Sequence, residues 1–162
     1  MRDVFTDAIA LLKADHRAIK DLFRQFDHTR SGSRRKKLGQ QICSETKIHL
    51  LVEEDAFSSF GHGSKSKNCH RAKMLLRDIE TALKNGTPFA AMVAELSRHF
   101  EHHIHEQETL SGGVFATSRK SGLDLHTLQS RIEARKKELL VELKSTGPAA
   151  SQPMRRALLA AA

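Results

Sequence analysis

The apolar residues of this chain recur every three or four positions, and this spacing constrains its fold more than any other feature. Segments 3–26, 34–60, 68–85, 88–110 and 124–144 each carry such a stripe, and no convincing strand pattern stands beside them. Short connections join the first four segments, each about five turns long. The chain is therefore predicted to be all-α, an antiparallel up-down-up-down four-helix bundle with an additional C-terminal helix.

The 162 residues are enough for one domain with a buried core. We expect this domain at residues 1–145, followed by a flexible tail at residues 146–162, because Gly147, Pro148 and Pro153 interrupt that end. The chain has only two cysteines, which argues against a disulfide framework and favours the cytoplasm. No signal peptide and no apolar run of roughly 18 residues is visible, so no membrane association is predicted.

Turn-forming residues mark the boundary between the third and fourth segments. Gly86 suits the position after a helix C-terminus, where a left-handed backbone is common. Thr87 can then cap the next helix, and Pro88 suits its first position. Residues 111–122 contain three glycines and show no clean period, so we expect them to form a connection.

His49 and Glu53 lie four positions apart within the second segment. On a helix this spacing puts both side chains on one face, one turn apart. Ile42 and Ala56 share that face, so the pair should point into the core. A buried carboxylate beside a buried imidazole needs compensation, and a bound metal ion commonly supplies it. Taken alone, the pair could equally be a surface ion pair or a core histidine with its hydrogen bonds satisfied.

Each of the first four segments carries a histidine: His16, His49, His70 and His103. His16 lies inside the apolar stripe of its segment, and His103 lies on the apolar side of the fourth. A four-helix bundle brings such side chains together on its axis, where imidazole and carboxylate groups bind iron, manganese or zinc. Three histidines on core faces, one with a carboxylate four residues later, indicate a metal site.

Three motifs make the chain similar to the hemerythrin-like family, whose unit is the HHE cation-binding domain. They are Asp15-His16, His49-x-x-x-Glu53-Glu54 and the His-His-Ile-x-Glu run from His102. The similarity covers roughly residues 5–145. It implies an antiparallel four-helix bundle that holds a non-haem di-iron centre with histidine ligands and bridging carboxylates. Members of the family bind O₂, or sense or handle oxygen, nitric oxide, peroxide or iron, and few are conventional enzymes.

For this chain the resemblance implies metal ligands at His16, His49, Glu53, His70, His103 and Gln107. Iron is the expected cofactor, with a di-iron centre favoured and a single iron or zinc as alternatives. A small diatomic molecule or peroxide is the expected ligand. No general base, nucleophile or phosphate-binding loop is evident, so we expect no conventional enzyme. Peroxide or nitric oxide chemistry could still come from the metal itself.

The fourth segment departs from the family, which has His-x-x-x-Glu there. The apolar stripe aims His103 and Gln107 inward, so a neutral amide occupies the carboxylate position. Glu106 or Glu108 could rotate in as the second carboxylate, and in the first case His102 would replace His103. Two divalent ions beside Glu53 alone would leave uncompensated charge in the core, which is costly.

The third segment departs as well, because its apolar positions place Cys69 nearer the core than His70. An irregular first turn could bring His70 inward. Otherwise Cys69 occupies that position, and its thiolate could help to bind zinc.

A second interpretation is a metal-free or zinc-bound basic interaction module with a degenerate site. Its support is the net charge of +8 and the basic runs at residues 34–37 and 135–137. No aromatic residues interleave with these runs for base stacking, so nucleic acid is not the expected partner. The sequence does not identify a protein partner.

Overall fold

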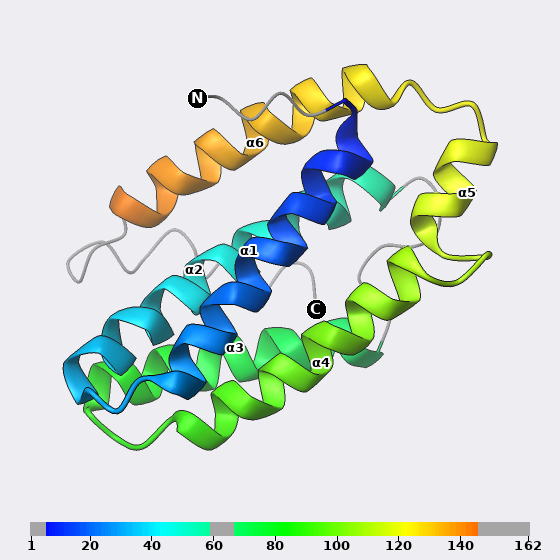
Figure 1. Ribbon diagram of the computed structural model, residues 1–162. Coiled ribbons are helices and arrows are strands. Elements are labelled where there is room, and N and C mark those ends of the chain that lie inside the picture. Colours follow the sequence, from blue (N-terminus) through cyan, green and yellow to red (C-terminus); the bar gives the residue numbers. More distant parts are fainter. Residues whose placement is uncertain (1–5, 59–66, 146–162) are drawn as a thin grey trace.

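The structure is a computed structural model that describes residues 6–58 and 67–145 (Figure 1). This part of the chain holds six helices and no strand, which confirms the all-α prediction. The helices are α1 (Ala8–His28), α2 (Gly32–Phe57), α3 (Lys67–Asn85), α4 (Ala90–Glu108), α5 (Val114–Lys120) and α6 (Leu125–Ser145). The predicted helix start at residue 3, the predicted end at residue 60 and the predicted tail all lie outside the described residues.

Side-chain caps begin three of the helices at polar residues. The Asp7 carboxylate accepts a hydrogen bond from the backbone N–H of Ala10 at the start of α1 (2.9 Å). Ser31 caps α2 in the same way. Asp124 accepts hydrogen bonds from two backbone N–H groups in the first turn of α6 (3.1 Å each). These caps fix where the helices start.

The boundary between α3 and α4 confirms one prediction and corrects another. Gly86 has a positive φ of 69° after the end of α3, as expected for a left-handed C-terminal residue. However, α4 begins at Ala90 with Phe89 as its N-cap, and not at Pro88 after Thr87. Phe89 keeps a non-helical backbone while its ring packs near the Phe26 ring, with centroids 5.8 Å apart. The tertiary contact therefore delays the helix start.

The short helix α5 lies in a region that was predicted to be only a connection. Seven residues are too few for a helical period to stand out in the sequence. Val114 and Phe115 are buried, so packing against the rest of the molecule stabilises this helix of about two turns.

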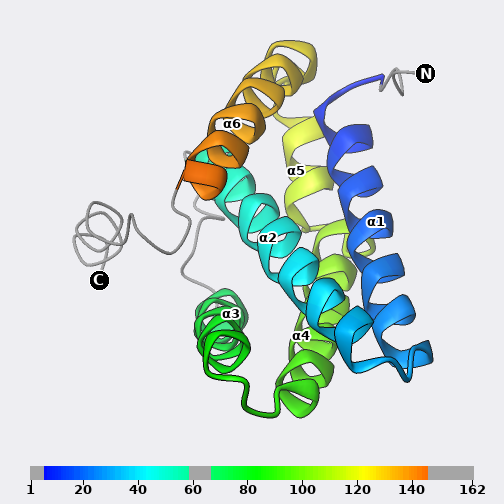
Figure 2. The same cartoon turned by 90° about the vertical axis from the view of Figure 1, so that its left-hand side faces the viewer.

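The first four helices contact one another in a closed order. α1 packs against α2 and α4, and α3 packs against α2 and α4. α6 lies across α1 and α2, beside the C-terminal part of α2 (Figure 2). None of the described helices is long and apolar enough to cross a membrane.

Two clusters of buried apolar residues lie inside the molecule. The first apolar cluster contains residues of the four helices α1, α2, α3 and α4. It includes Ile19, Ile42, Cys43, Leu75, Ile79, Leu96 and Phe100. The second apolar cluster joins α1 and α2 to α5 and α6 and includes Leu12, Ile48, Val52, Phe57, Phe115, Leu128 and Ile132. On α1, His16 lies between Leu12 of the second cluster and Ile19 of the first. Polar residues therefore occupy the junction of two apolar clusters.

Candidate metal centre

Four side chains from three helices converge at this junction. His16 comes from α1, His49 and Glu53 come from α2, and His103 comes from α4. Each offers one ligand atom, and these atoms all lie within 4.8 Å of one another. His16 and His49 are each 1% exposed and Glu53 is 6% exposed, so these three are buried, and His103 is half-buried. The helical spacing of His49 and Glu53 puts both on the inner face of α2, as the sequence predicts.

The Glu53 carboxylate lies at the centre of the group. Its Oε1 faces Nε2 of His49 at 3.2 Å and Nε2 of His16 at 3.5 Å. Its Oε2 faces Nε2 of His103 at 2.9 Å and accepts a hydrogen bond from Nε2 of Gln107 at 2.8 Å. Each carboxylate oxygen therefore serves a different pair of residues.

Aromatic rings enclose the imidazoles. The His16 ring lies between Phe100 and Phe115, with its centroid 5.8 Å from each. Phe100 also stacks on His103, and it meets the His49 ring edge-on. These apolar walls exclude water, which strengthens electrostatic interactions inside the group.

Two further carboxylates lie behind the imidazoles. Nδ1 of His16 donates to Oε1 of Glu108 at 2.6 Å. Nδ1 of His49 lies 3.7 Å from Oδ2 of Asp15, and the other Asp15 oxygen accepts a hydrogen bond from Lys136 at 2.6 Å. Both carboxylates therefore approach the nitrogen that faces away from the centre of the group.

The burial and the charges of this group shift its pKa values in opposite directions. Burial alone would lower the pKa of His49, but the charges of Glu53 and Asp15 outweigh it and raise that pKa to about 9. Burial would raise the pKa of Glu53, and the surrounding histidines instead hold it well below its usual value. The pKa of Asp15 is lowered, because His49 and Lys136 outweigh its burial. The raised pKa of His49 favours its protonated, positively charged form at neutral pH when no metal is bound.

The chemistry of the donors fits a metal ion. Four buried polar atoms of the centre have no hydrogen bond: Glu53 Oε1, His103 Nε2, His49 Nδ1 and Gln107 Oε1. Buried polar atoms without partners are costly and rare, so each calls for an explanation. Three imidazole nitrogens and one carboxylate oxygen are a donor set that suits iron, zinc or manganese. A cation held by His16, His49, Glu53 and His103 would contact two of these unpaired atoms directly, Glu53 Oε1 and His103 Nε2.

His70, the metal ligand that the resemblance implies on α3, lies outside the group of four residues. His70 is exposed on α3, whereas the family resemblance placed it among the ligands. The reason is the phase of α3, whose buried residues Leu75, Leu76 and Ile79 fix the rotation of the helix. Cys69 is half-buried against the first apolar cluster and is not among the four grouped donors.

Glu106, Gln107 and Glu108, the three alternatives for the carboxylate position on α4, have different partners. Glu106 pairs with His102 at 3.2 Å, and the His102 side chain is 55% exposed, so both lie outside the group. Glu108 contacts His16 from behind, at Nδ1. Gln107 does point inward, but it uses its amide N–H₂ as a donor to Glu53.

Asp15, which faces His49, and Lys136, which pairs with Asp15, were not among the predicted site residues. Asp15 was noted only as part of the family motif, because it lies off the apolar stripe of its helix. Lys136 lies in the apolar row of its helix, eight residues after Leu128 and four after Ile132. A lysine in such a row is the feature of the sequence that could have indicated a buried partner for it.

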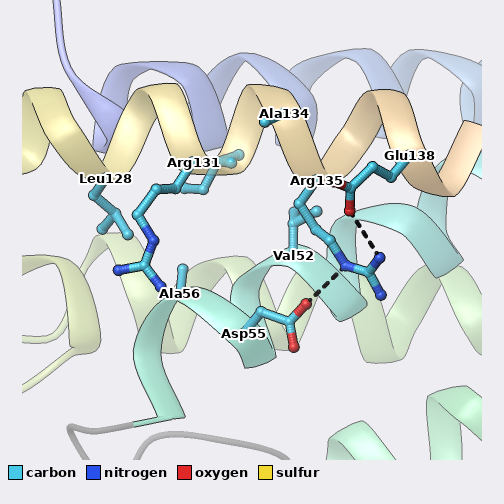
Figure 3. Close-up of a pocket in the computed structure, with 9 residues that line it drawn as sticks. Val52, Asp55, Ala56, Leu128, Arg131, Ala134, Arg135 and Glu138 are labelled. Atoms are coloured by element: carbon cyan, nitrogen blue, oxygen red, sulfur yellow. Dashed lines mark hydrogen bonds and ion pairs between the residues drawn. The ribbon is translucent and has the colours of Figure 1, made fainter.

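A surface groove of about 460 Å³ lies nearby, between α2 and α6 (Figure 3). Val52, Ala56, Leu128 and Ile132 supply its apolar lining, and Arg135 contributes charge. None of the four grouped residues lines this groove, so it is separate from the candidate metal centre.

The comparisons with known proteins agree with this geometry. The family model of the hemerythrin HHE cation-binding domain matches residues 7–111, which is more than half of the chain. The match includes all four grouped residues and ends before α5 and α6. The comparisons with curated proteins and with solved structures found no match.

Proposed function

Because the chain belongs to the hemerythrin HHE cation-binding domain family, we propose that it holds non-haem iron and binds O₂, nitric oxide or peroxide there. The observation that carries this proposal is the convergence of His16, His49, Glu53 and His103 on one buried point. These four residues are the proposed ligands. Bound ferrous iron with an open coordination position would supply the binding of a small ligand.

The helix contacts support the expected bundle as the frame of this centre. The closed order of contacts among α1, α2, α3 and α4 is the order that an antiparallel up-down-up-down bundle requires. The short connections after α1 and α3 favour antiparallel neighbours. In this arrangement three of the four helices contribute ligands, and α3 contributes only its apolar face.

The donor set supports one tightly bound iron better than the di-iron centre that the resemblance favours. A second ion at Glu53 Oε2 would find His103 and the carbonyl oxygen of Gln107, both without a hydrogen bond. It would find no second carboxylate, because Glu108 is engaged by His16. The extra positive charge would stay uncompensated in a buried site.

The protein's own residues would hold the ligands and keep water out. Phe100 and Phe115 cover the imidazoles, and the His103 side chain, at 19% exposed, is the most accessible of the four. We therefore propose that small ligands enter along α4. The proposed role is binding or sensing in the cytoplasm, without a conventional catalytic reaction.

The test is elemental analysis of protein purified without chelator, together with its absorption spectrum. We expect about one iron per chain in the wild type and none in a His49→Ala variant. His126→Ala removes a surface histidine of α6 and is the matched control. Two irons per chain would contradict the single-iron part alone. Zinc in place of iron would contradict the metal identity, and no metal at all would overturn the proposal.

The contacts of the basic residues do not favour the alternative of a metal-free interaction module. Arg135 forms ion pairs with Asp55, Glu138 and Glu142 within the molecule. The guanidinium of Arg35 lies over the Phe26 ring, 5.4 Å from its centroid. Part of each basic run is thus used to hold the fold together and is not free to bind an acidic partner.

A further inference from the structure

α6 lies beyond the part of the chain that matches the family, yet it reaches the metal centre through one side chain. Lys136 Nζ donates to Oδ1 of Asp15 at 2.6 Å, across a separation of 121 residues in sequence. The other oxygen of the same carboxylate faces Nδ1 of His49 at 3.7 Å. A chain of three side chains thus runs from α6 through α1 to a proposed ligand on α2.

We propose that Lys136 is a positioning residue of the metal centre, which holds Asp15 as the acceptor for Nδ1–H of His49. The proposal rests on the proposed function, since it concerns how one proposed ligand is oriented. It assigns to α6 a task beyond covering the core. Lys136 acts through Asp15 and does not itself contact the ligand atoms.

The requirement for such an acceptor follows from the chemistry of histidine. A metal ion on Nε2 leaves the single proton of a neutral imidazole on Nδ1. His49 is 1% exposed, so water does not reach that N–H, and no hydrogen bond satisfies it among the described residues. Oδ2 of Asp15 is likewise buried and without a hydrogen bond, and it is the acceptor that faces this N–H. Ligand histidines characteristically donate this second N–H to a carboxylate, which fixes the tautomer and the ring orientation.

The position of Lys136 explains how Asp15 is held. Leu128, Ile132 and Lys136 follow one another at intervals of four, so the lysine stands in the row that faces α1 and α2. Leu128 and Ile132 are buried in the second apolar cluster, and Lys136 is 22% exposed. Figure 3 shows the neighbouring residue Arg135, which pairs with Asp55 of α2 and with Glu138 of α6 itself. The ammonium group therefore approaches Asp15 from a helix that packs against both α1 and α2.

The carboxylate beside His16 is also contacted by a lysine, and the two lysine–carboxylate contacts can be compared. Glu108 accepts from Nδ1 of His16, and Lys13 lies 3.9 Å from its other oxygen. Lys13 is 39% exposed, so its hold on Glu108 is loose and open to water. The contact between Lys136 and Asp15 is shorter and better covered, with the carboxylate 17% exposed. Lys136 thus holds its carboxylate more firmly than Lys13 holds Glu108.

The first test asks whether Nδ1–H of His49 donates to Asp15 in metal-free protein, where the two atoms face each other at 3.7 Å. Proton NMR at one fixed pH should show a downfield, slowly exchanging ring N–H signal that disappears in His49→Gln. We expect the signal to be lost in Lys136→Met and Asp15→Asn, and to be kept in Lys136→Arg. Lys137→Met removes the same charge from the neighbouring exposed position of α6 and should also keep it. A signal that survives in Lys136→Met would overturn the proposal.

The second test measures the consequence for metal binding. Affinity for Fe²⁺, and for Co²⁺ with its geometry-dependent visible spectrum, would be measured by competition with a chelator. We expect Lys136→Met to bind roughly tenfold to a hundredfold more weakly than Lys137→Met, and Lys136→Arg to recover most of the loss. In an Asp15→Asn background the Lys136→Met change should add little, because the lysine acts through that carboxylate.

The outcomes separate this proposal from the proposed function. A wild-type protein that binds neither metal, but shows the NMR signal and loses it in Lys136→Met, contradicts the proposed function and supports the positioning contact. A wild type that binds metal with the same affinity and spectrum as Lys136→Met overturns the positioning role alone. A fall in unfolding free energy without a change in affinity or spectrum would also overturn it, since a purely structural contact gives that result.

Discussion

Gln107 is the residue that most distinguishes this centre from the pattern of its family. It stands where the family has a carboxylate, and its amide donates to Glu53 at 2.8 Å. In the metal-free protein this hydrogen bond satisfies one oxygen of a buried anion. The amide therefore gives the centre less negative charge than a carboxylate would, which supports the proposed single iron.

Replacing Gln107 with glutamate should change both the number of bound iron ions and the stability of the metal-free protein. We expect Gln107→Glu to raise the iron content from about one to about two per chain, because a second carboxylate offsets the added charge. The metal-free variant should be less stable than the wild type, because two carboxylates would then stand within hydrogen-bond distance of each other. Elemental analysis and urea unfolding in chelator would measure the two effects. Gln40→Glu, at an exposed position of α2, should alter neither.

The ionisation of His49 and Glu53 predicts how the stability of the metal-free protein depends on pH. The raised pKa of His49, about 9, contributes stability that is full below its unfolded value near 6.5 and is lost as pH rises through about 9. The lowered pKa of Glu53 contributes stability above pH 4.5 that is lost as pH falls further. The pair should therefore stabilise the fold most between about pH 4.5 and 6.5.

Urea unfolding in chelator between pH 5 and 9 would check this expectation. The free energy of unfolding should fall from about pH 6 to pH 9 in the wild type. Glu53→Gln removes a major cause of the raised His49 pKa, so its curve should be flatter over that range. Curves of equal slope for the two proteins would contradict the assignment.

At the scale of elements, the turn between α4 and α5 determines where the end of α4 lies. Gly113 is the N-cap of α5 and donates its N–H to the carbonyl of Leu110 at 2.8 Å. A Cβ at this position would lie 2.5 Å from the carbonyl oxygen of Glu106 and 2.9 Å from that of Gln107. These atoms belong to the backbone of the last turn of α4 and cannot rotate away.

We expect Gly113→Ala to destabilise the fold by about 1–3 kcal/mol, because the backbone must move to relieve the contact. Metal affinity should fall too, since the displaced turn carries Gln107 and Glu108. Gly112→Ala is a matched control at the preceding residue, where a Cβ would meet no atom within 4 Å. Urea unfolding and chelator competition on both variants would measure the difference. Equal stability of the two variants would show that the turn yields without cost.

At the scale of the whole molecule, the metal centre lies where the two apolar clusters meet. The first cluster contains residues of α1, α2, α3 and α4, and the second contains residues of α1, α2, α5 and α6. A metal ion bound to α1, α2 and α4 would link elements of both clusters. Metal binding should therefore stabilise the entire fold, and not the site alone.

Thermal unfolding would measure this coupling. With free metal at 100 times its dissociation constant, we expect about 2.7 kcal/mol of added stability, which corresponds to roughly 5–10 °C in Tm. Excess chelator should remove the increase. The His49→Ala variant should show a much smaller increase on metal addition, because it lacks one proposed ligand. An equal increase in that variant would indicate that the metal binds elsewhere.

The helical period by itself located five of the six described helices and turned four residues of the candidate site toward the core. Each stripe is a local property, so the rotation of His16, His49, Glu53 and His103 toward a core follows from spacing along single helices. The same phase argument indicated that His70 would face away from the core, as it does. Local spacing also located the glycine that ends α3.

The tertiary structure decided the features that depend on contacts between distant segments. The start of α4 at Ala90 depends on packing of Phe89, and α5 depends on burial of Val114 and Phe115. Glu106, Gln107 and Glu108 have their partners on α4, α2 and α1 respectively, and no period along α4 encodes these contacts. The contact of Lys136 with Asp15 joins residues 121 positions apart, and only the docking of α6 brings them together. Periodicity fixes which face of a helix is buried, whereas the neighbour that each buried side chain meets is a property of the assembled fold.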